Sequence, residues 1–390
     1  MTKRICVLTS AHPAFDVRIF HKECKSLVRA GYDVTLIAPY GEDLARGGVQ
    51  VKAIRQRTGR LRRITLTTWD ALVNALRENG DLYHFHDPEL IPVGLTLRLC
   101  GKRVVYDIHE DLPKTLAYKQ YLPEWLKPLL VRTLDFTERC ASRVFSGLIV
   151  ATPFLKDRFE RCNRNVAVIA NYPLIDEFSA VRDPENCADS SLVDSFIYVG
   201  MRITAARGAK EMVEAVGLLK EGAQLDLVGE FDPPELQKTL AGLAGWRRVK
   251  VHGFLGRDEI SRAISRSTAG LVTLHPEPNY LTAFPVKLFE YMAAGIPVIA
   301  SDFPACREIV EQAGCGLLVD PLNPKEIANA MRFLQENPDE AREMGERGRT
   351  SILGKMNWTN EEKQLLRLYE KLLVERPEHA GEAEGCKLPS

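Results

Sequence analysis

The sequence predicts an α/β protein of two domains, each a parallel sheet covered by helices on both faces. Short, continuous apolar runs typical of buried parallel strands alternate with stretches of helical periodicity. This alternation lapses once, near residues 171–191, and then restarts. The length of 390 residues also suits two domains of ordinary size.

The first half begins with a strand and a helix. Arg4–Thr9 (RICVLT) predicts the strand, and Arg18–Ala30 predicts a helix that stops at Gly31. Asp33–Ala38 predicts the second strand, which Pro39 ends. Further strands are expected at Asp81–His84, Arg103–Asp107 and Gly147–Ala151, and helices at Thr65–Glu78, Pro88–Cys100 and Pro123–Ser142.

The stretch 171–191 is polar and contains two prolines, which predicts a linker. Strands then follow at Phe196–Val199, Gln224–Val228, Arg248–His252, Ala269–Leu274, Pro297–Ala300 and Gly316–Val319. We therefore expect a first domain over residues 1–172, a linker over 173–192, a second domain over 193–356, an amphipathic helix over 357–375 that packs back toward the first domain, and a disordered tail over 376–390.

Composition excludes several classes of protein. The 52 Lys and Arg residues balance the 52 Asp and Glu residues, so overall charge gives no support for nucleic-acid binding. The nine cysteines are scattered without a CxxC pair, which argues against a disulfide framework or a zinc site and favours the cytoplasm. We expect no signal peptide, and no run reaches the roughly 18 apolar residues of a membrane span.

In open parallel sheets, ligands bind beyond the carboxyl ends of the strands. The most informative stretch there is FPVKLFEYMAAGIPVIASD, where Pro285 is expected to be the first residue of a helix that Gly295 ends. Lys287 and Glu290 share one face of its first turns. The helix start and Lys287 suit a phosphate, and Glu290 suits a ribose diol. The alternative is a surface Lys–Glu pair on an ordinary helix.

A second stretch, VGMRITAARGAKE, places Arg202 and Arg207 on either side of a short loop that leads into a helix. Two guanidiniums that converge on a diphosphate can replace a metal ion, because each offers fixed, bidentate donors. The alternative is a solvated basic loop.

Histidines follow two strands of the first half. His109, in VVYDIHED, lies just past a strand end, where it can donate to a substrate hydroxyl or to developing charge. No second histidine stands at ligand spacing beside it, so no metal is expected there. In YHFHDPE, we expect His84 and His86 to point to opposite faces, one under the helix layer and one toward the ligand crevice. The alternative for each histidine is a structural polar contact.

The loop after the first strand, SAHPAFDVRIFHK, carries His12, Asp16, Arg18 and His21. It contains neither the GxGxxG turn of a dinucleotide site nor a Walker loop, which argues against a nicotinamide enzyme and a P-loop enzyme. A polar loop of this kind suits an acceptor sugar or a phosphate. No GxSxG elbow is present, so a hydrolase is weakly supported.

Taken together, the motifs HPAFDVRIFHKE, FHDPELIPVG, VVYDIHED, VGMRITAARG and PNYLTAFPVKLFEYMAAGIPVIASD resemble those of the family-4 retaining glycosyltransferases. The resemblance covers about residues 3–375 and is greatest to the bacterial branch that makes cell-surface polysaccharides. It implies a GT-B fold, in which two Rossmann-like domains face a central cleft. It also implies transfer of a hexose or N-acetylhexosamine from a UDP- or GDP-linked donor to a saccharide or lipid-linked saccharide, without a metal or other cofactor.

The resemblance also implies residue roles. The diphosphate pair falls on Arg202 and Arg207, the second position being usually Lys, and the histidine near the donor sugar falls on His109. The ribose-binding Glu of the Glu-x7-Glu motif falls on Glu290, whereas the first Glu is replaced by Thr282. Other donor-site residues are expected to be Pro285, Lys287, Glu277, Asn279 and Tyr280, and acceptor-site residues His12, Asp16, Arg18 and His86.

A membrane contact is a further expectation. The arginines at 55, 57, 60, 62 and 63 and the apolar segment Tyr121–Leu134 suit an anionic membrane surface, such as the inner face of the plasma membrane. A solvated loop and an ordinary core helix are the alternative. Two other functions stay open: a GT-B-fold sugar-nucleotide epimerase, and a non-catalytic sugar-nucleotide-binding subunit, which only Thr282 supports.

Overall fold

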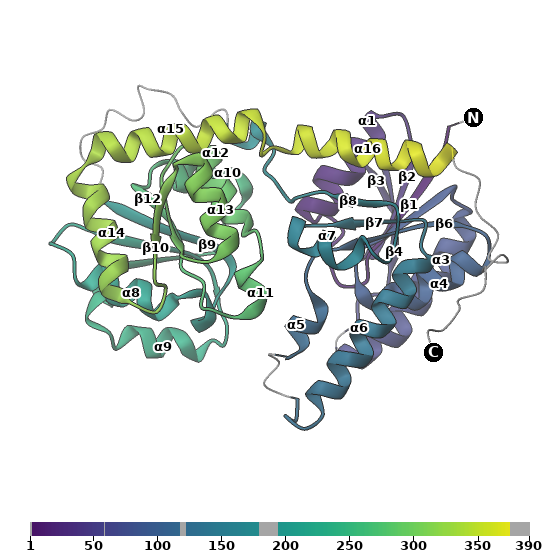
Figure 1. Ribbon diagram of the computed structural model, residues 1–390, viewed down its shortest axis with the longest axis horizontal. Helices are drawn as coiled ribbons and strands as arrows, with labels where there is room; N and C mark the ends of the chain where they lie inside the picture. Colours follow the sequence, from purple (N-terminus) through teal and green to yellow (C-terminus); the bar gives the residue numbers. More distant parts are fainter. Residues whose placement is uncertain (1, 58, 118–121, 179–193, 375–390) are drawn as a thin grey trace, which may run out of the picture. The chain divides into compact units, whose positions relative to one another are not determined.

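The computed structural model describes residues 2–57, 59–117, 122–178 and 194–374, and the chain divides into two compact units (Figure 1). Unit 1 contains Met1–Ala170 and Glu361–Ser390, and unit 2 contains Asn171–Asn360. Most of the expected linker over 173–192 and the whole expected tail over 376–390 lie outside the described residues.

Unit 1 is built on an eight-stranded sheet within the described residues, in the order β3-β4-β2-β1-β5-β6-β7-β8. All neighbouring strands are parallel except β3, which runs antiparallel to β4 at the sheet edge. The strands are β1 (Arg4–Leu8), β2 (Asp33–Pro39), β3 (Leu44–Arg46), β4 (Val49–Ile54), β5 (Leu82–Phe85), β6 (Arg103–Ile108), β7 (Gly147–Val150) and β8 (Val166–Val168).

The helices of unit 1 connect these parallel strands. They are α1 (Lys25–Arg29), α2 (Arg60–Arg62), α3 (Thr68–Glu78), α4 (Ile91–Leu99), α5 (Leu112–Ala117), α6 (Lys127–Val144) and α7 (Pro153–Phe159). π-Helical segments, Val17–Cys24 and Arg63–Thr67, lead into α1 and α3. The last helix, α16 (Trp358–Val374), begins in unit 2, and its residues from Glu361 onward belong to unit 1.

Unit 2 has a six-stranded sheet among its described residues, with the order β11-β10-β9-β12-β13-β14 and every pair parallel. This is the Rossmann order, in which the chain reverses direction across the sheet between its first and fourth strands. The strands are β9 (Ser195–Ile203), β10 (Gln224–Phe231), β11 (Val249–Gly253), β12 (Ala269–Val272), β13 (Val298–Ser301) and β14 (Gly316–Val319).

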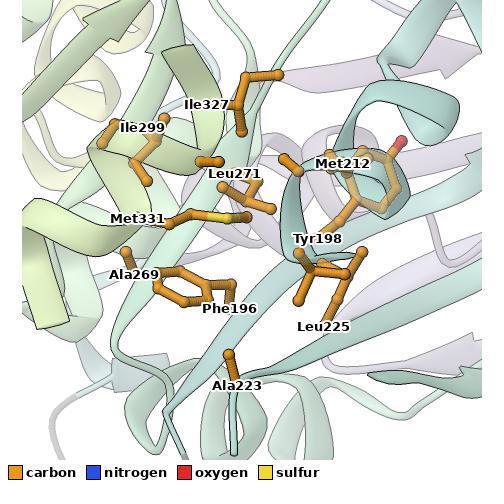
Figure 2. Packing of buried hydrophobic residues seen from close by; sticks show 14 of the residues in the cluster. Phe196, Tyr198, Met212, Ala223, Leu225, Ala269, Leu271, Ile299, Ile327 and Met331 are labelled. Carbon is orange, nitrogen blue, oxygen red and sulfur yellow. The ribbon is translucent and has the colours of Figure 1, made fainter. Parts of the chain in front are cut away.

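The helices of unit 2 are α8 (Ala209–Gly217), α9 (Glu235–Ala241), α10 (Arg257–Ser265), α11 (Pro278–Leu281), α12 (Val286–Ala294), α13 (Pro304–Ala313), α14 (Pro324–Glu336) and α15 (Pro338–Gly354). Figure 2 shows how one face of the sheet is filled: side chains of β9, β10, β12 and β13 pack against α8 and α14. Phe196, Leu225, Leu271, Met212 and Met331 are fully enclosed there. This packing fixes the strand ends at which the loops of unit 2 begin.

The predicted α/β class of parallel sheets covered by helices is confirmed, and the predicted strands form. The edge strands β3 and β8, and β4 next to β3, were not predicted. In β4, Gln50 and Lys52 interrupt the apolar run because one face of this strand is more exposed than in the central strands, so its pattern differs from theirs. In both sheets, the order places a switch point at the centre, between β1 and β5 and between β9 and β12.

Candidate functional site

The two arginines predicted to bind a diphosphate lie at the end of β9. This strand continues to Ile203, so Arg202 belongs to the strand rather than to the loop after it. Its Nη1 atom is 3.0 Å from Asp232 Oδ2, and its side chain is 61% exposed. Arg207 ends the following turn, and its Nη1 donates to the carbonyl oxygen of Arg202 at 3.3 Å. One short segment therefore presents both guanidiniums.

Gly208 makes this turn possible. Its φ is +75°, a left-handed conformation that favours glycine, and a Cβ atom there would be 2.1 Å from the carbonyl oxygen of Thr273. The backbone of the turn thus lies directly against the segment after β12, and His275 N–H donates to Ala206 O at 2.9 Å. Strand ends on both sides of the switch point are joined in this way.

Helix α12 supplies the next cation. Pro285 is the cap residue before the helix rather than its first residue, a difference of one position. Lys287 Nζ lies 3.5 Å from the centre of the Tyr198 ring and is enclosed, without a hydrogen-bond acceptor among the described residues. Burial lowers the pKa of Lys287 well below its usual value, and the charge of Arg207 acts in the same direction.

One turn further along α12 lies Glu290, whose side chain is only 7% exposed. Its Oε1 accepts a hydrogen bond from Arg257 Nη1 at 2.8 Å. As predicted, Gly295 ends the helix in the left-handed conformation. The structure thus brings Arg207, Lys287 and Glu290 together beyond the carboxyl end of the unit 2 sheet.

The residues suggested as substitutes for the missing first Glu lie on or next to α11. Glu277 is the cap residue before this helix, Asn279 and Tyr280 lie within it, and Thr282 follows its last residue. Burial opposes the charge of Arg207, but interactions with Tyr198 and Tyr280 raise its pKa. Tyr280 therefore belongs to the same group of side chains as the diphosphate candidates.

In unit 1, Asp87 organises the loop that follows β1. Its Oδ2 accepts from the Thr9 hydroxyl at 2.7 Å and from the N–H groups of Ser10 and Ala11 at 2.6 and 3.1 Å. Its Oδ1 lies 3.0 Å from His12 Nδ1. Burial opposes protonation of His12, but Asp87 raises its pKa. The loop therefore presents a histidine whose protonated form Asp87 stabilises.

His109 is the more exposed end of a buried polar network. Its side chain is 27% exposed, and its Nε2 lies 3.4 Å from Asp107 Oδ2. His86 Nδ1 is 3.2 Å from the same His109 nitrogen, and His86 itself is buried. His86 thus supports His109 from behind instead of facing solvent as an acceptor-site residue would.

The expectation that His84 and His86 point to opposite faces is wrong. Both side chains are buried, with ring centres 4.4 Å apart, because residues two apart in a strand share one face of the sheet. On its other side, His84 Nδ1 is 2.7 Å from the hydroxyl of Tyr369 in α16.

Arg18 and Asp16 also have internal partners. Asp16 caps the π-helical segment, accepting from the N–H groups of Arg18 and Ile19 at 2.8 and 3.0 Å. The Arg18 guanidinium is buried, donates to Asp107 at 2.9 Å and forms an ion pair with Glu23 at 3.0 Å. A guanidinium enclosed in this way does not offer free donors to an acceptor, in contrast to the expectation from the sequence.

Glu23, His84, His86 and Asp107 place potential metal-ligand atoms within 4.8 Å of one another. However, Arg18 already pairs with both carboxylates, so the cluster contains its own cation. Burial, reinforced by Asp107, raises the pKa of Glu23 well above its usual value, although Arg18 opposes this. These residues fit a buried ion-pair network better than a metal centre.

Comparisons with known proteins agree with this arrangement. Residues 193–351 match the family model of glycosyl transferases group 1, and residues 17–172 match that of glycosyltransferase family 4. A relative, MMP alpha-(1->4)-mannosyltransferase of Mycolicibacterium hassiacum, is 23% identical over 330 residues, which are 79% of this chain and 78% of the relative.

Solved structures share the fold. Sucrose-phosphate synthase from Thermosynechococcus elongatus matches with a TM-score of 0.77 and 20% identity, over 95% of this chain and 99% of that one. Anabaena Alr3699/HepE in complex with UDP and glucose matches with a TM-score of 0.73 and 16% identity, over 95% of this chain and 100% of that one. The two parallel-sheet units thus define a glycosyltransferase of the GT-B fold.

The two family models together span most of the chain, and with the mannosyltransferase relative they support a glycosyltransferase of family 4. Within the described residues, no helix is both long and apolar enough to cross a membrane.

Proposed function

We propose that the protein is a retaining, metal-independent glycosyltransferase of surface-polysaccharide biosynthesis. It moves a hexose or N-acetylhexosamine from a UDP- or GDP-linked donor to a saccharide or lipid-linked saccharide. One observation carries the proposal: Arg207 and the enclosed, acceptor-free ammonium of Lys287 lie together at the start of α12, one turn from Glu290. A helix start with added cations favours a pyrophosphate, and a carboxylate at this spacing favours the adjoining ribose.

In the proposed reaction, the nucleotide sugar binds to unit 2. Arg202, Arg207 and Lys287 contact its diphosphate, and Glu290 accepts hydrogen bonds from the ribose hydroxyls. As the glycosidic bond breaks, negative charge grows on the leaving diphosphate. Preorganised cations stabilise this charge more in the transition state than in the ground state, and they take the place of a divalent ion.

Unit 1 binds the acceptor in this proposal. His109, held by Asp107 and His86, positions the donor sugar or the attacking hydroxyl, and His12 contacts the acceptor. No carboxylate stands out as a covalent nucleophile, so we favour attack from the face that the diphosphate leaves, with retention of configuration. The UDP complex of the structural relative supports UDP as a nucleotide to test, and the mannosyl transfer of the sequence relative supports a hexose as the transferred sugar.

A lipid-linked acceptor would bring unit 1 to an anionic membrane. Figure 1 shows α5 and α6 extending together from the sheet of this unit. Trp125, just before α6, is 80% exposed, and Leu129 and Phe136 on α6 are 63% and 67% exposed, with the exposed Arg132 between them. Two of the clustered arginines are already paired, Arg57 with Asp70 and Arg63 with Glu89, so α6 carries the stronger argument.

A thermal-shift screen of UDP-, GDP-, ADP- and TDP-sugars, run both with and without EDTA, tests the donor site. One nucleotide should raise the melting temperature, because a ligand that binds only the native state stabilises it. Arg202→Ala and Glu290→Ala should remove the shift, whereas Arg262→Ala, an exposed residue of α10, should keep it. A shift that persists in both site variants would defeat the assignment, and a shift that EDTA abolishes would defeat metal independence.

The reaction and the membrane contact need separate tests. With the selected donor, NMR of the product should show the anomeric configuration of the donor, and inversion would contradict retention. Vesicles that contain anionic lipid should sediment the wild-type protein but much less of Trp125→Ser/Phe136→Ser, which replaces two exposed aromatic residues. Equal sedimentation of both proteins would remove the membrane proposal and leave the donor site unaffected.

A further inference from the structure

Arg257 was not among the residues predicted from the sequence, yet it makes the direct contact with Glu290. It is the first residue of α10, just after the loop that follows β11. Its Nη1 donates to Glu290 Oε1 at 2.8 Å, across 33 positions of the sequence. Among the described residues, no hydrogen bond is found to the other oxygen of Glu290, Oε2.

A second carboxylate fixes this guanidinium from the other side. Arg257 Nη2 forms an ion pair with Glu177, and the Ser261 hydroxyl, one turn further along α10, donates to the Glu177 carbonyl oxygen at 2.8 Å. Burial opposes the charge of Arg257, but Glu290 and then Glu177 raise its pKa. The guanidinium is thus permanently charged and held by two segments, so it has one orientation toward Glu290.

We propose that Arg257 is a positioning residue for nucleotide recognition: it fixes the carboxylate of Glu290 through one oxygen and leaves the other oxygen for the ribose hydroxyls. The inference rests on the proposed function, because it takes Glu290 as the ribose-binding residue. The new element is that the preference for ribose over deoxyribose depends on Arg257, a side chain that does not itself contact the sugar.

The physical reason is the environment of Glu290. A carboxylate this enclosed loses much of its hydration, and a carboxylate that is free to rotate must be ordered before it can accept a hydrogen bond from a ligand. With Arg257 in place, the orientation of the Glu290 carboxylate is set before the nucleotide binds, so hydrogen bonds to ribose cost no rearrangement. Without Arg257 this orientation is lost, and the ribose hydroxyls contribute little more to binding than hydrogen atoms in their place would.

The test compares nucleoside diphosphates with their 2′-deoxy and 3′-deoxy forms by calorimetric titration. UDP, GDP and ADP are the probes, and the tightest one is carried forward. Wild-type protein should prefer the ribonucleotide by about tenfold or more, the value of a hydrogen bond to a charged group. Arg257→Gln should reduce this preference to about threefold or less, and Glu290→Gln should do the same. Arg262→Gln, on the exposed side of the same helix, should keep the wild-type ratio.

Two further variants separate orientation from charge. Arg257→Lys keeps a cation but loses the planar pair of N–H donors that a guanidinium offers, so an intermediate preference for the ribonucleotide is expected. This variant serves as the test if Arg257→Gln does not fold. Glu177→Gln leaves the contact between Arg257 and Glu290 in place and should keep most of the preference.

The outcomes distinguish the two proposals. A full ribose preference in Arg257→Gln, or in Arg257→Lys where only that variant folds, overturns the positioning role and leaves the donor site standing. Tighter ribonucleotide binding by Arg257→Gln also overturns it, because Arg257 would then compete with ribose for Glu290. No preference in the wild type, or a full preference in Glu290→Gln, overturns the ribose assignment, and no nucleotide binding at all overturns the proposed function.

Discussion

Replacing Lys287 with methionine should make the protein more stable and at the same time impair donor binding. The Lys287 ammonium is enclosed over the Tyr198 ring, next to Arg207, and has no hydrogen-bond acceptor among the described residues. Methionine has a similar length, no polar atom to satisfy, and enough flexibility to fill the same space against the aromatic ring. The substitution therefore removes an electrostatic cost and keeps the packing.

The size of the gain follows from two opposing contributions. Enclosing an amine without a hydrogen bond costs about 1–3 kcal/mol. The contact with the Tyr198 ring returns about 0.5–2 kcal/mol if the group is charged, and burial works against that charge. The midpoints of these two ranges leave a net stabilisation of about 1 kcal/mol, which corresponds to a rise of about 2–4 °C in melting temperature for a unit of this size. Loss of one charged contact to a phosphate should weaken nucleotide binding by about 10–100-fold.

The pH dependence gives an independent check of the cause. Burial puts the pKa of Lys287 in the folded protein below its ordinary value of 10.5, so the unfolded chain binds more protons. Stability of the wild type therefore rises with pH in this interval. The advantage of Lys287→Met should be largest near pH 7 and shrink as the pH approaches 10.5.

Differential scanning calorimetry from about pH 7 to 9.5 and nucleotide titration measure the two effects in the same samples. Lys325 provides the matched control, because it is also the second residue of a helix, α14, but is exposed. Lys325→Met should change neither melting temperature nor binding appreciably. Destabilisation by Lys287→Met, a pH-independent difference, or unaltered diphosphate affinity would each refute the reasoning.

Three further substitutions test other parts of the fold by chemical unfolding. Gly208→Ala should destabilise unit 2 by about 2–4 kcal/mol, because the new Cβ would meet Thr273 O and the φ is left-handed. Asp87→Asn should cost about 2–4 kcal/mol near pH 7. Burial opposes ionisation of Asp87, but its donors hold its pKa well below 3.8, so this difference should begin to shrink as the pH falls below 3.8 and vanish only below the depressed pKa of the folded protein. Tyr369→Phe should cost about 1–2 kcal/mol, because it deprives His84 of its partner.

Each of these expectations has a result that contradicts it. Gly222 has a φ of +103°, and no atom lies within 4 Å of an added Cβ, so Gly222→Ala measures the effect of backbone strain alone. If Gly208→Ala lowers stability by the same amount as Gly222→Ala, the clash with Thr273 O contributes nothing. For Asp87, a difference that persists at low pH would show that shape rather than charge is responsible. A Tyr369→Phe variant as stable as the wild type would show that the hydroxyl contributes nothing.

Local sequence patterns predicted how several residues of the candidate donor site lie relative to one another. Pro285, Lys287, Glu290 and Gly295 lie on one helix, so their relations follow from helical spacing, and the structure shifts only the start by one residue. Arg257 could not be found in this way, because its contact with Glu290 depends on how β11 is placed beside the rest of the sheet. Its position just after a strand was the available signal.

Two expectations for unit 1 were wrong for different reasons. The spacing of His84 and His86 places them on the same face of a strand, because side chains alternate with a period of two residues, so the expectation of opposite faces misapplied this period. Arg18 was expected to line the ligand crevice because it follows the first strand, at the carboxyl end of the sheet. One of its partners, Glu23, lies in the same π-helical segment, but the other, Asp107, belongs to β6, and the sequence does not encode this second contact locally.

The path of α16 has a consequence for synthesis of the chain. Unit 1 begins at the amino terminus but is completed by residues after Glu361, including Tyr369 and Leu372, which adjoin His84 and Gly147. A ribosome must therefore synthesise all of unit 2 and then α16 before unit 1 has this structural element, whereas unit 2 lies within one uninterrupted stretch. A premature stop before α16 would consequently destabilise unit 1, most of which is translated before unit 2.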